Sequence, residues 1–330
     1  MPSEAAARTG GATGTARTLF PVTELVVDGM VPWCTATLDR AFARRKDPAW
    51  LDEASSKPES RLLLVGEGGL LPVDDRGELG WRPVGEAAPA EGLIFLGIDE
   101  TGRALFALET GDRFSATDFV PFRQIGGELG LPDAAAALEA VGLTEWHRRH
   151  PFCARCGSAT EPTEGGHRRG CPRCGTSHFP RMDPAVIMLV CDRDQCLLAR
   201  RVNAPEGRWS TLAGYVEPGE SLEVAVAREV HEEVALAVRA VRYRGSQPWP
   251  FPSSLMLAFE AEVEPDVPVV DGKEIGDARW FTRTDLSEGI ESGAIAIPGP
   301  IAASNFLIRS WLGLLPETAG LGRETSPTGR

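Results

Sequence analysis

A run of fifteen residues, from Ser221 to Ala235, constrains the fold of this chain more than any other segment. A helix advances by roughly 100° per residue, so side chains four apart share one face. Apolar residues recur at that spacing along the run, at Leu222, Val226, Val230 and Val234. The pattern predicts an amphipathic helix that buries one side against a sheet.

Three carboxylates, Glu229, Glu232 and Glu233, fall on one arc beside that apolar stripe. Like charges one turn apart destabilise a helix, which favours a role for divalent cations among them. Mg²⁺ and Mn²⁺ bind carboxylate oxygens together with the phosphate oxygens of a substrate. The alternative is a solvated acidic face, which is the usual meaning of a short run of charge.

The helix belongs to a longer pattern, Gly214-x5-Glu220-x7-Arg228-Glu229-x2-Glu232-Glu233. This pattern resembles the Nudix box of diphosphate hydrolases, in which Glu220 and Arg228 are expected to brace the helix. It departs from the family at Ala235, where the family has glycine. If the backbone there needs φ > 0, alanine costs on the order of 1 kcal/mol, but no proposed ligand is lost.

A second signature runs Ser246-Gln-Pro-Trp-Pro-Phe-Pro-Ser-Ser-Leu-Met256. Its alternate prolines fix φ and lack backbone donors, which excludes a central strand and predicts a stiff extended segment presenting Trp249 and Phe251. Packing of both aromatics into a core is the alternative. Beside the Nudix box, the string resembles the SQPWPFPxS signature of the NADH pyrophosphatase branch of the superfamily.

Four cysteines are spaced as Cys153-x2-Cys156-x14-Cys171-x2-Cys174. This spacing suits a tetrahedral, structural Zn²⁺ with no open coordination position. Disulfides are the alternative, which the absence of a signal peptide disfavours because cytoplasmic thiols stay reduced. The NADH pyrophosphatase family carries a four-cysteine zinc ribbon at this place. The other cysteines show no ligand spacing and are expected to be inert: Cys34, Cys191 and Cys196.

The chain has 330 residues and a formal net charge of −13. The acidic balance argues against broad binding to nucleic acid or to anionic membranes. It also means that an anionic diphosphate needs metal ions and local cations. The longest apolar run, about 185–191, is too short to cross a bilayer. We therefore expect no membrane partner, and the absence of a signal peptide leads us to expect a cytoplasmic enzyme.

The expected fold class is α+β, a Nudix α/β/α sandwich with a mixed sheet, preceded by a zinc ribbon and a degenerate Nudix-like N-terminal domain. The N-terminal domain holds no second glutamate box, so no catalytic role is expected there. The expected units are disordered residues 1–17, the Nudix-like domain 18–132, a linking helix 133–149, the zinc ribbon 150–180, the catalytic Nudix domain 181–316 and a disordered tail 317–330. Strands are expected at 61–65, 93–97, 185–191, 196–201, 209–213, 255–263 and 278–281.

The resemblance implies metal-dependent hydrolysis of the pyrophosphate bond of NADH and NAD⁺, giving nicotinamide mononucleotide and AMP, and extends to the NAD cap of RNA 5′ ends. It implies Mg²⁺ or Mn²⁺ ligation by Glu229, Glu233, the Ala213 carbonyl and Glu274. Glu232 is expected to act as a ligand or through water. Glu274 is a metal ligand or the general base; by itself, a glutamate beside a lysine is more often a surface residue.

The family's substrate-binding positions fall on Phe179, Tyr215, Gln247, Trp249, Phe251, Ser254, Met256, Arg123 and Ser304. Phe179 and Tyr215 suit stacking on a base or nicotinamide ring, with core packing as the alternative for Phe179. The segment from Gln247 to Ser254 is expected to reach across a homodimer. Ser304 stands where the family has alanine.

Two other classes of function remain open. One is a Nudix hydrolase of another nucleoside diphosphate such as ADP-ribose, which the complete SQPWPFP string disfavours. The other is a zinc-ribbon binding module with an inactive box, which the intact glutamates and the acidic charge disfavour.

Overall fold

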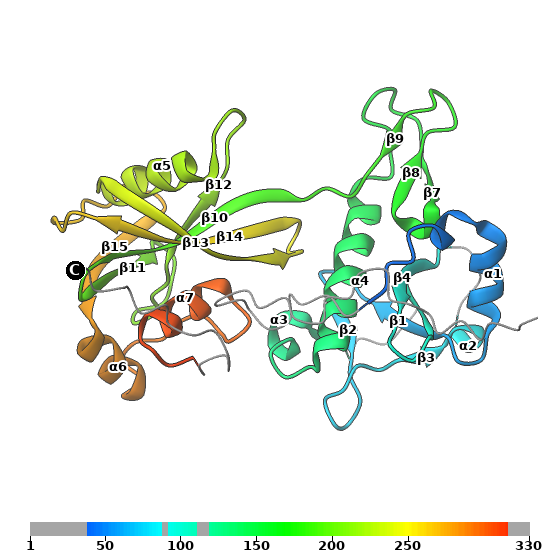
Figure 1. The fold of residues 1–330 in the computed structure, drawn as a ribbon, viewed down its shortest axis with the longest axis horizontal. Coiled ribbons are helices and arrows are strands. Elements are labelled where there is room, and N and C mark those ends of the chain that lie inside the picture. The colour runs from blue at the N-terminus through cyan, green and yellow to red at the C-terminus, as the bar shows by residue number, and fades with distance from the viewer. Residues whose placement is uncertain (1–37, 88–91, 111–118, 316–330) are drawn as a thin grey trace, which may run out of the picture.

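Two bodies, each built on a β-sheet, are joined by helix α4 and strand β10 (Figure 1). The computed structural model describes residues 38–87, 92–110 and 119–315. The ends expected to be disordered, 1–17 and 317–330, lie outside the described residues, as does Cys34. Within the described ranges, no helix is both long and apolar enough to cross a membrane.

The N-terminal body is a four-stranded sheet covered on both faces. Its strand order is β3-β1-β5-β4, with β1 and β5 parallel and the other pairs antiparallel. Leu63 and Val65 pack with α4, whereas Leu62 and Leu64 pack on the side of α1, as alternation along a strand requires. The bounds are α1 Pro48–Ser56, β1 Arg61–Val65, β3 Arg82–Pro83, α2 Val84–Ala87, β4 Ile94–Ile98, β5 Ala104–Glu109 and α4 Leu131–Arg149.

These bounds confirm the strand expected at 61–65 and place the one expected at 93–97 one residue later. Helix α4 covers residues 131–149, where a helix at 133–149 was expected. Beside the sheet lie a two-stranded ribbon, β2 (Leu70–Pro72) with β6 (Phe119–Pro121), and the short helix α3 (Phe122–Ile125). A 3₁₀ turn, η2 (Arg44–Lys46), precedes α1.

A small three-stranded ribbon projects from the end of α4 (Figure 1). It contains β7 (Glu161–Thr163), the 3₁₀ turn η5 (Glu164–Gly166), β8 (Arg168–Gly170) and β9 (Ser177–His178). Two histidines tie it to the N-terminal body. His167 Nε2 donates to the carbonyl of Phe95 at 2.8 Å, and His147 Nε2 donates to the carbonyl of Gly166 at 2.7 Å. Burial is the main cause that lowers the pKa of both imidazoles to about 4.

The C-terminal body is a six-stranded mixed sheet between helices. The strand order is β13-β14-β10-β11-β15, with β12 also pairing with β10. One face of β10 packs under α5 and the other under α6 and α7, which makes the α/β/α sandwich expected from the sequence. The bounds are β10 Asp183–Asp192, β11 Gln195–Arg201, β12 Leu212–Tyr215, α5 Leu222–Val234, β13 Val238–Trp249, β14 Ser254–Val263, β15 Ile275–Thr282, α6 Arg283–Glu291 and α7 Ala303–Trp311.

One expected strand is displaced. The strand expected at 209–213 is observed at Leu212–Tyr215, with only an isolated bridge between Ser210 and Ala199 before it. Trp209 is buried because its ring packs edge-to-face on Phe281 at 5.2 Å, so its apolar character reflects core packing outside the strand.

The proline-rich segment is a hairpin, which corrects the expectation of a single extended segment. β13 is the edge strand and ends at Trp249, which pairs with Ser254 at the start of β14. An edge strand tolerates Pro248 because no neighbouring strand needs its missing donor. Phe251, in the turn, lies 6.1 Å from the ring of Phe122 and packs with the N-terminal core. The hairpin therefore connects the two bodies.

Candidate active site

The box helix α5 begins and ends as its sequence predicts. The Ser221 hydroxyl accepts the backbone N–H of Val224 at 3.3 Å, which caps the N-terminus. At the other end Ala235 adopts the left-handed conformation, with φ 58° and ψ 24°, and its N–H bonds the carbonyl of His231. The position where the Nudix family has glycine therefore does need φ > 0, and alanine there carries strain.

Arg228 connects the carboxylates of the site. Its guanidinium binds both oxygens of Glu220, at 2.7 and 3.0 Å, and donates to Glu229 at 2.8 Å and to Glu232 at 3.0 Å. It also donates to the backbone carbonyl of Tyr215 at 2.8 Å. With its donors used in this way, Arg228 offsets the repulsion that three glutamates on one arc create and holds the loop before the helix.

Gly214 admits the carboxylate of Glu229 against strand β12. A Cβ at residue 214 would lie 1.9 Å from Cδ of Glu229 and 2.0 Å from its Oε1. Any side chain at this position would displace the carboxylate. Burial raises the pKa of Glu229 and Arg228 opposes that shift. Ala213 lies next along β12, opposite Ile187 of β10.

Glu233 is the most buried carboxylate of the box, 5% exposed. Its Oε2 has no hydrogen-bond partner among the described residues. Burial, together with the negative charges of Glu274 and Glu229, raises the pKa of Glu233 to about 8. A buried carboxylate oxygen with no partner, surrounded by other acids, fits the donor set of a hard divalent cation.

Glu274 approaches the box from the loop between β14 and β15. Its Oε1 pairs with Nη2 of Arg201 at 2.7 Å, and half of its side chain is exposed. Asp271 caps this loop by accepting the N–H groups of Glu274 and Ile275, at 3.0 and 2.8 Å. The N–H of Asp271 in turn bonds the carbonyl of Glu233 at 3.3 Å, which ties the loop to the end of the helix. The sequence offered no signal for the part played by Arg201 and Asp271.

A cavity of about 490 Å³ lies between α4 and the C-terminal body. Its wall includes Tyr215, whose hydroxyl lies 3.4 Å from that of Ser254. Among the predicted substrate residues only Tyr215 lines it; Trp146, Arg149, His150 and Arg181 had not been singled out from the sequence. The lining residues are Gly142, Trp146, Arg149, His150, Arg181, Asp183, Pro184, Tyr215, Val216, Pro252 and Ser253.

The other predicted substrate residues differ in exposure. Phe179 is 67% exposed, and the guanidinium of Arg123 lies over the ring of Phe251 at 4.9 Å. In contrast, Gln247 is buried: it donates to the carbonyl of Ile301 and accepts the N–H of Ala303 at 2.8 Å. Three residues complete the placement: Trp249 lies 5.2 Å from Phe251, Met256 packs on the core beneath α7, and buried Ser304 accepts the N–H of Thr211 at 3.2 Å.

The ribbon cysteines form a metal-binding cluster. All four Sγ atoms lie within 4.8 Å of one another. The pairs Cys153–Cys174 and Cys156–Cys171 are 3.6 and 3.5 Å apart, close to the edge of about 3.8 Å expected for a tetrahedron of sulfurs around zinc. All four are free thiols, so the disulfide alternative is not observed. Across residues 38–315, apart from the two internal gaps, no other such cluster is found.

Two cysteines of the catalytic domain have a different character. Cys191 of β10 and Cys196 of β11 stand opposite each other on these neighbouring strands. Burial raises the pKa of their thiols to about 11 and about 12. Protonated thiols of this kind are inert, as expected from the sequence.

Comparison with known proteins agrees with this architecture. Residues 181–297 match the model of the NUDIX domain, and residues 148–179 match that of the NADH pyrophosphatase zinc ribbon domain. The chain is 37% identical over 294 residues to the NAD-capped RNA hydrolase NudC of Mycobacterium bovis, covering 83% of this chain and 92% of that protein. It is 43% identical over 240 residues to the NudC of Deinococcus radiodurans, covering 70% and 82%.

Among solved structures, a NUDIX hydrolase from Nitrosomonas europaea aligns with a TM-score of 0.38 and 26% identity, covering 48% of this chain and 89% of that one. The box helix, its carboxylates and the sandwich around them define a Nudix hydrolase. Within that class, the chain belongs to the NudC family, whose zinc ribbon it also carries.

Proposed function

We propose that this chain hydrolyses the pyrophosphate bond of NAD(H), both in the free dinucleotide and in the NAD cap at an RNA 5′ end. Water would attack one phosphorus and the bridging oxygen would leave with the other phosphate, giving nicotinamide mononucleotide and AMP, or 5′-monophosphate RNA. The observation that carries the proposal is the buried, unpartnered oxygen of Glu233 beside Glu229 and Glu274. The names of the NudC relatives and the SQPWPFP string support NAD(H) as the substrate.

The donor set suits Mg²⁺ or Mn²⁺ because every donor is a hard oxygen. Glu229, Glu233, Glu274 and the carbonyl of Ala213 would hold the ions, which supply charge neutralisation and a water of lowered pKa when bound. Arg228 keeps the carboxylates oriented and is too fully paired to bind phosphate itself. Glu232, largely exposed at the edge of the arc, acts as a ligand or through water. Glu274, also exposed, serves as a ligand or as the general base.

Two exposed aromatic rings support binding of a planar ligand. Tyr215 is 56% exposed and borders both the box and the cavity. Phe179, exposed on the linker, is the second candidate for stacking on a base or on nicotinamide. The cavity wall also holds Arg149, paired with Glu145, and Arg181, paired with Asp183, so these cations are largely compensated there. The other predicted substrate residues are proposed on the family resemblance alone.

The proposal includes a homodimer in the cytoplasm. The side chains of Phe179 and Met182 are exposed, and a second copy of the chain that covers them would remove apolar surface from water. A zinc site of four thiolates requires reduced cysteines, which supports the cytoplasm. Trp249→Ala is expected to raise KM for NADH or weaken dimerisation without changing metal affinity. Light scattering that finds an active monomer, with unaltered NADH kinetics in this variant, would contradict the dimer.

The direct test compares kcat/KM for NADH, NAD⁺, ADP-ribose and NAD-capped RNA, each with Mg²⁺ and with Mn²⁺. Release of nicotinamide mononucleotide from NAD(H) and from capped RNA is the expected result. A clear preference for ADP-ribose would instead identify a Nudix hydrolase of other nucleoside diphosphates. Absence of metal-dependent turnover on all four substrates would indicate a binding module.

A further inference from the structure

Positive charge is concentrated in one module of this acidic chain. Residues 147–182 contain seven arginines and two glutamates, a formal charge of +5, whereas the whole chain carries −13. A zinc ion bound by four thiolates contributes a formal −2, which leaves the module at about +3. The argument against nucleic-acid binding from net charge assumes that charge is evenly spread over the chain. Charge is not evenly spread here, because this module is positive.

Two arginines at the tip of the ribbon are free to bind a ligand. Arg155 and Arg173 occupy matching places, each directly before the second cysteine of its pair, in Cys-Ala-Arg-Cys and Cys-Pro-Arg-Cys. Because those two cysteines, Cys156 and Cys174, share one sulfur cluster, the arginines lie at the same end of the ribbon. Both are exposed, and neither guanidinium has an ion-pair or hydrogen-bond partner among the described residues.

The remaining arginines of the module are occupied. Each has a partner that fixes its side chain, and most of these partners are carboxylates: Arg148 and Arg149 bind Glu145, Arg168 binds Glu164, Arg181 binds Asp183, and Arg169 donates to Thr160. Within the part of the chain that the structure describes, Arg155 and Arg173 are therefore the arginines of this module whose guanidinium groups make no hydrogen bond or ion pair.

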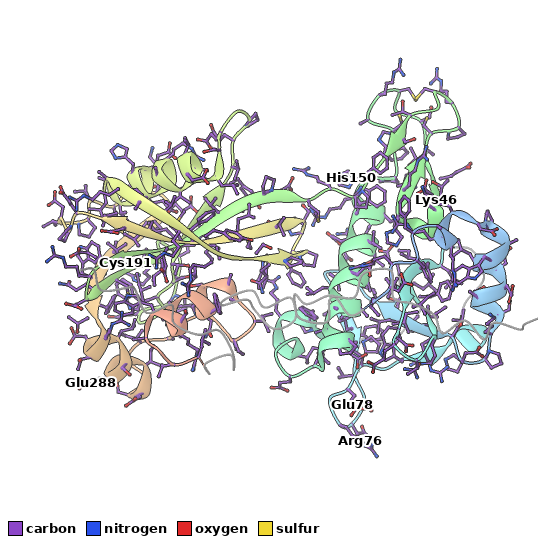
Figure 2. All side chains as sticks on the ribbon, in the orientation of Figure 1. Lys46, Arg76, Glu78, His150, Cys191 and Glu288 are labelled. Carbon is purple, nitrogen blue, oxygen red and sulfur yellow. The ribbon has the colours of Figure 1, made fainter. Side chains whose placement is uncertain are left out.

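The cavity provides a route from the Nudix box to the ribbon. Its lining includes Tyr215, whose carbonyl is bonded to Arg228. It also includes Arg149 and His150, where α4 ends. Figure 2 shows His150 at the base of the ribbon, and the first zinc ligand, Cys153, follows three residues later. An RNA strand that leaves the Nudix box through this cavity would reach the base of the ribbon.

We propose that Arg155 and Arg173 bind phosphodiesters in the body of an RNA whose NAD cap lies at the Nudix site. The proposal rests on the proposed function for the cap and adds a contact that a free dinucleotide is too short to reach. Phe152, 65% exposed beside Cys153, offers a face on which a base can stack. Free guanidinium groups next to an exposed ring favour a single strand, in which phosphates and bases alternate, over a lipid surface.

The test reverses the two charges and compares substrates of different length. In Arg155→Glu/Arg173→Glu, kcat/KM for a capped 30-nucleotide RNA is expected to fall about 10-fold at low salt. Hydrolysis of NADH and of a capped dinucleotide should be unchanged. The log–log salt dependence for the long RNA should become shallower by about 1.4, since each phosphate contact contributes about 0.7 on a single strand.

A matched control changes the net charge by the same amount elsewhere. Arg76 and Arg193 are exposed on turns, and neither guanidinium has a partner among the described residues. Figure 2 shows Arg76 at the opposite end of the N-terminal body from the ribbon. Arg76→Glu/Arg193→Glu should therefore behave as wild type on every substrate. Zinc content and Tm of both double variants verify that the ribbon is intact.

Three outcomes overturn the proposal. They are wild-type kcat/KM for the long RNA in the ribbon variant, an equal fall in the control variant, and wild-type protein that binds phosphatidylserine vesicles but not RNA. If wild type hydrolyses neither NADH nor capped RNA, the proposed function fails separately. Binding of an uncapped 5′-monophosphate 30-mer then decides: weaker binding by the ribbon variant supports the RNA surface, and equal binding refutes it.

Discussion

The carboxylate of Glu229 lies so close to the backbone of Gly214 that a Cβ there would be 1.9 Å from its Cδ. The glycine of the Nudix box is therefore required by space: its φ is not in the left-handed region. Gly214 leaves room for the carboxylate of Glu229, and Arg228 donates a hydrogen bond to that carboxylate at 2.8 Å.

Gly214→Ala should lower kcat at least ~100-fold, about 2.7 kcal/mol of transition-state stabilisation, because Glu229 must leave its place. The matched control is Gly299→Ala, whose Cβ would meet nothing within 4 Å and whose backbone is not left-handed. Steady-state kinetics with saturating Mg²⁺ check both variants. An active Gly214→Ala enzyme would show that this close approach is not needed.

Glu233→Gln should abolish turnover, by at least ~100-fold, and yet stabilise the fold at pH 8 without Mg²⁺ or Mn²⁺. The folded state keeps the Glu233 proton up to about pH 8, against a usual value of 4.5, so wild-type stability falls as pH rises through that interval. The amide removes this cost, about 4 kcal/mol at pH 8. Urea unfolding at pH 5 and 8 measures it; equal stability of both proteins at pH 8 would contradict the burial argument.

Ala235→Gly should stabilise the protein by roughly 0.5–1 kcal/mol, because glycine adopts the left-handed conformation without strain but loses more entropy on folding. Ala227→Gly, inside the same helix, should have the opposite effect and destabilise by about 1 kcal/mol. Urea unfolding separates the two. Destabilisation by both substitutions would mean that Ala235 is not strained.

Cys171→Ser should release zinc and lower Tm, because structural zinc binding is coupled to folding. Cys191→Ser, outside the cluster, should keep the full zinc content. Metal analysis and thermal unfolding test the pair. Wild-type protein without zinc, or a Cys171→Ser variant of full stability, would refute a structural site.

Acid should loosen the junction between ribbon and N-terminal body. His147 and His167 have pKa values lowered to about 4, so both stay neutral in the fold while the unfolded chain takes up protons below about 6.5. Their contribution to stability is complete above pH 6.5 and is lost as pH falls to 4. The double variant His147→Gln/His167→Gln should flatten this pH dependence by about 6 kcal/mol between pH 7 and pH 4 in urea unfolding. An unchanged profile would contradict the burial of neutral imidazoles.

The locally encoded features of this protein could be predicted from the sequence. The box helix follows from apolar residues four apart and a serine cap, and its observed bounds, Leu222–Val234, fall within the expected run. The zinc ligands follow from two cysteine pairs whose tight spacing brings the sulfurs together in any fold that forms the knuckles. The sequence also identified Ala235 as a position where a left-handed backbone would be strained, and the observed φ of 58° meets that condition.

Contacts between residues far apart in the chain were decided only by the tertiary structure. Periodicity shows which side of α5 is buried, but not that Glu233 has a buried carboxylate oxygen without a partner or that the Asp271 loop bonds the backbone of Glu233. The proline-rich segment forms a hairpin whose turn residue Phe251 packs on Phe122 of the other body, a contact between residues far apart in the sequence. Composition gives one net charge for the chain, whereas folding gathers Arg155 and Arg173 at a single tip, since the zinc cluster joins segments that the sequence keeps apart.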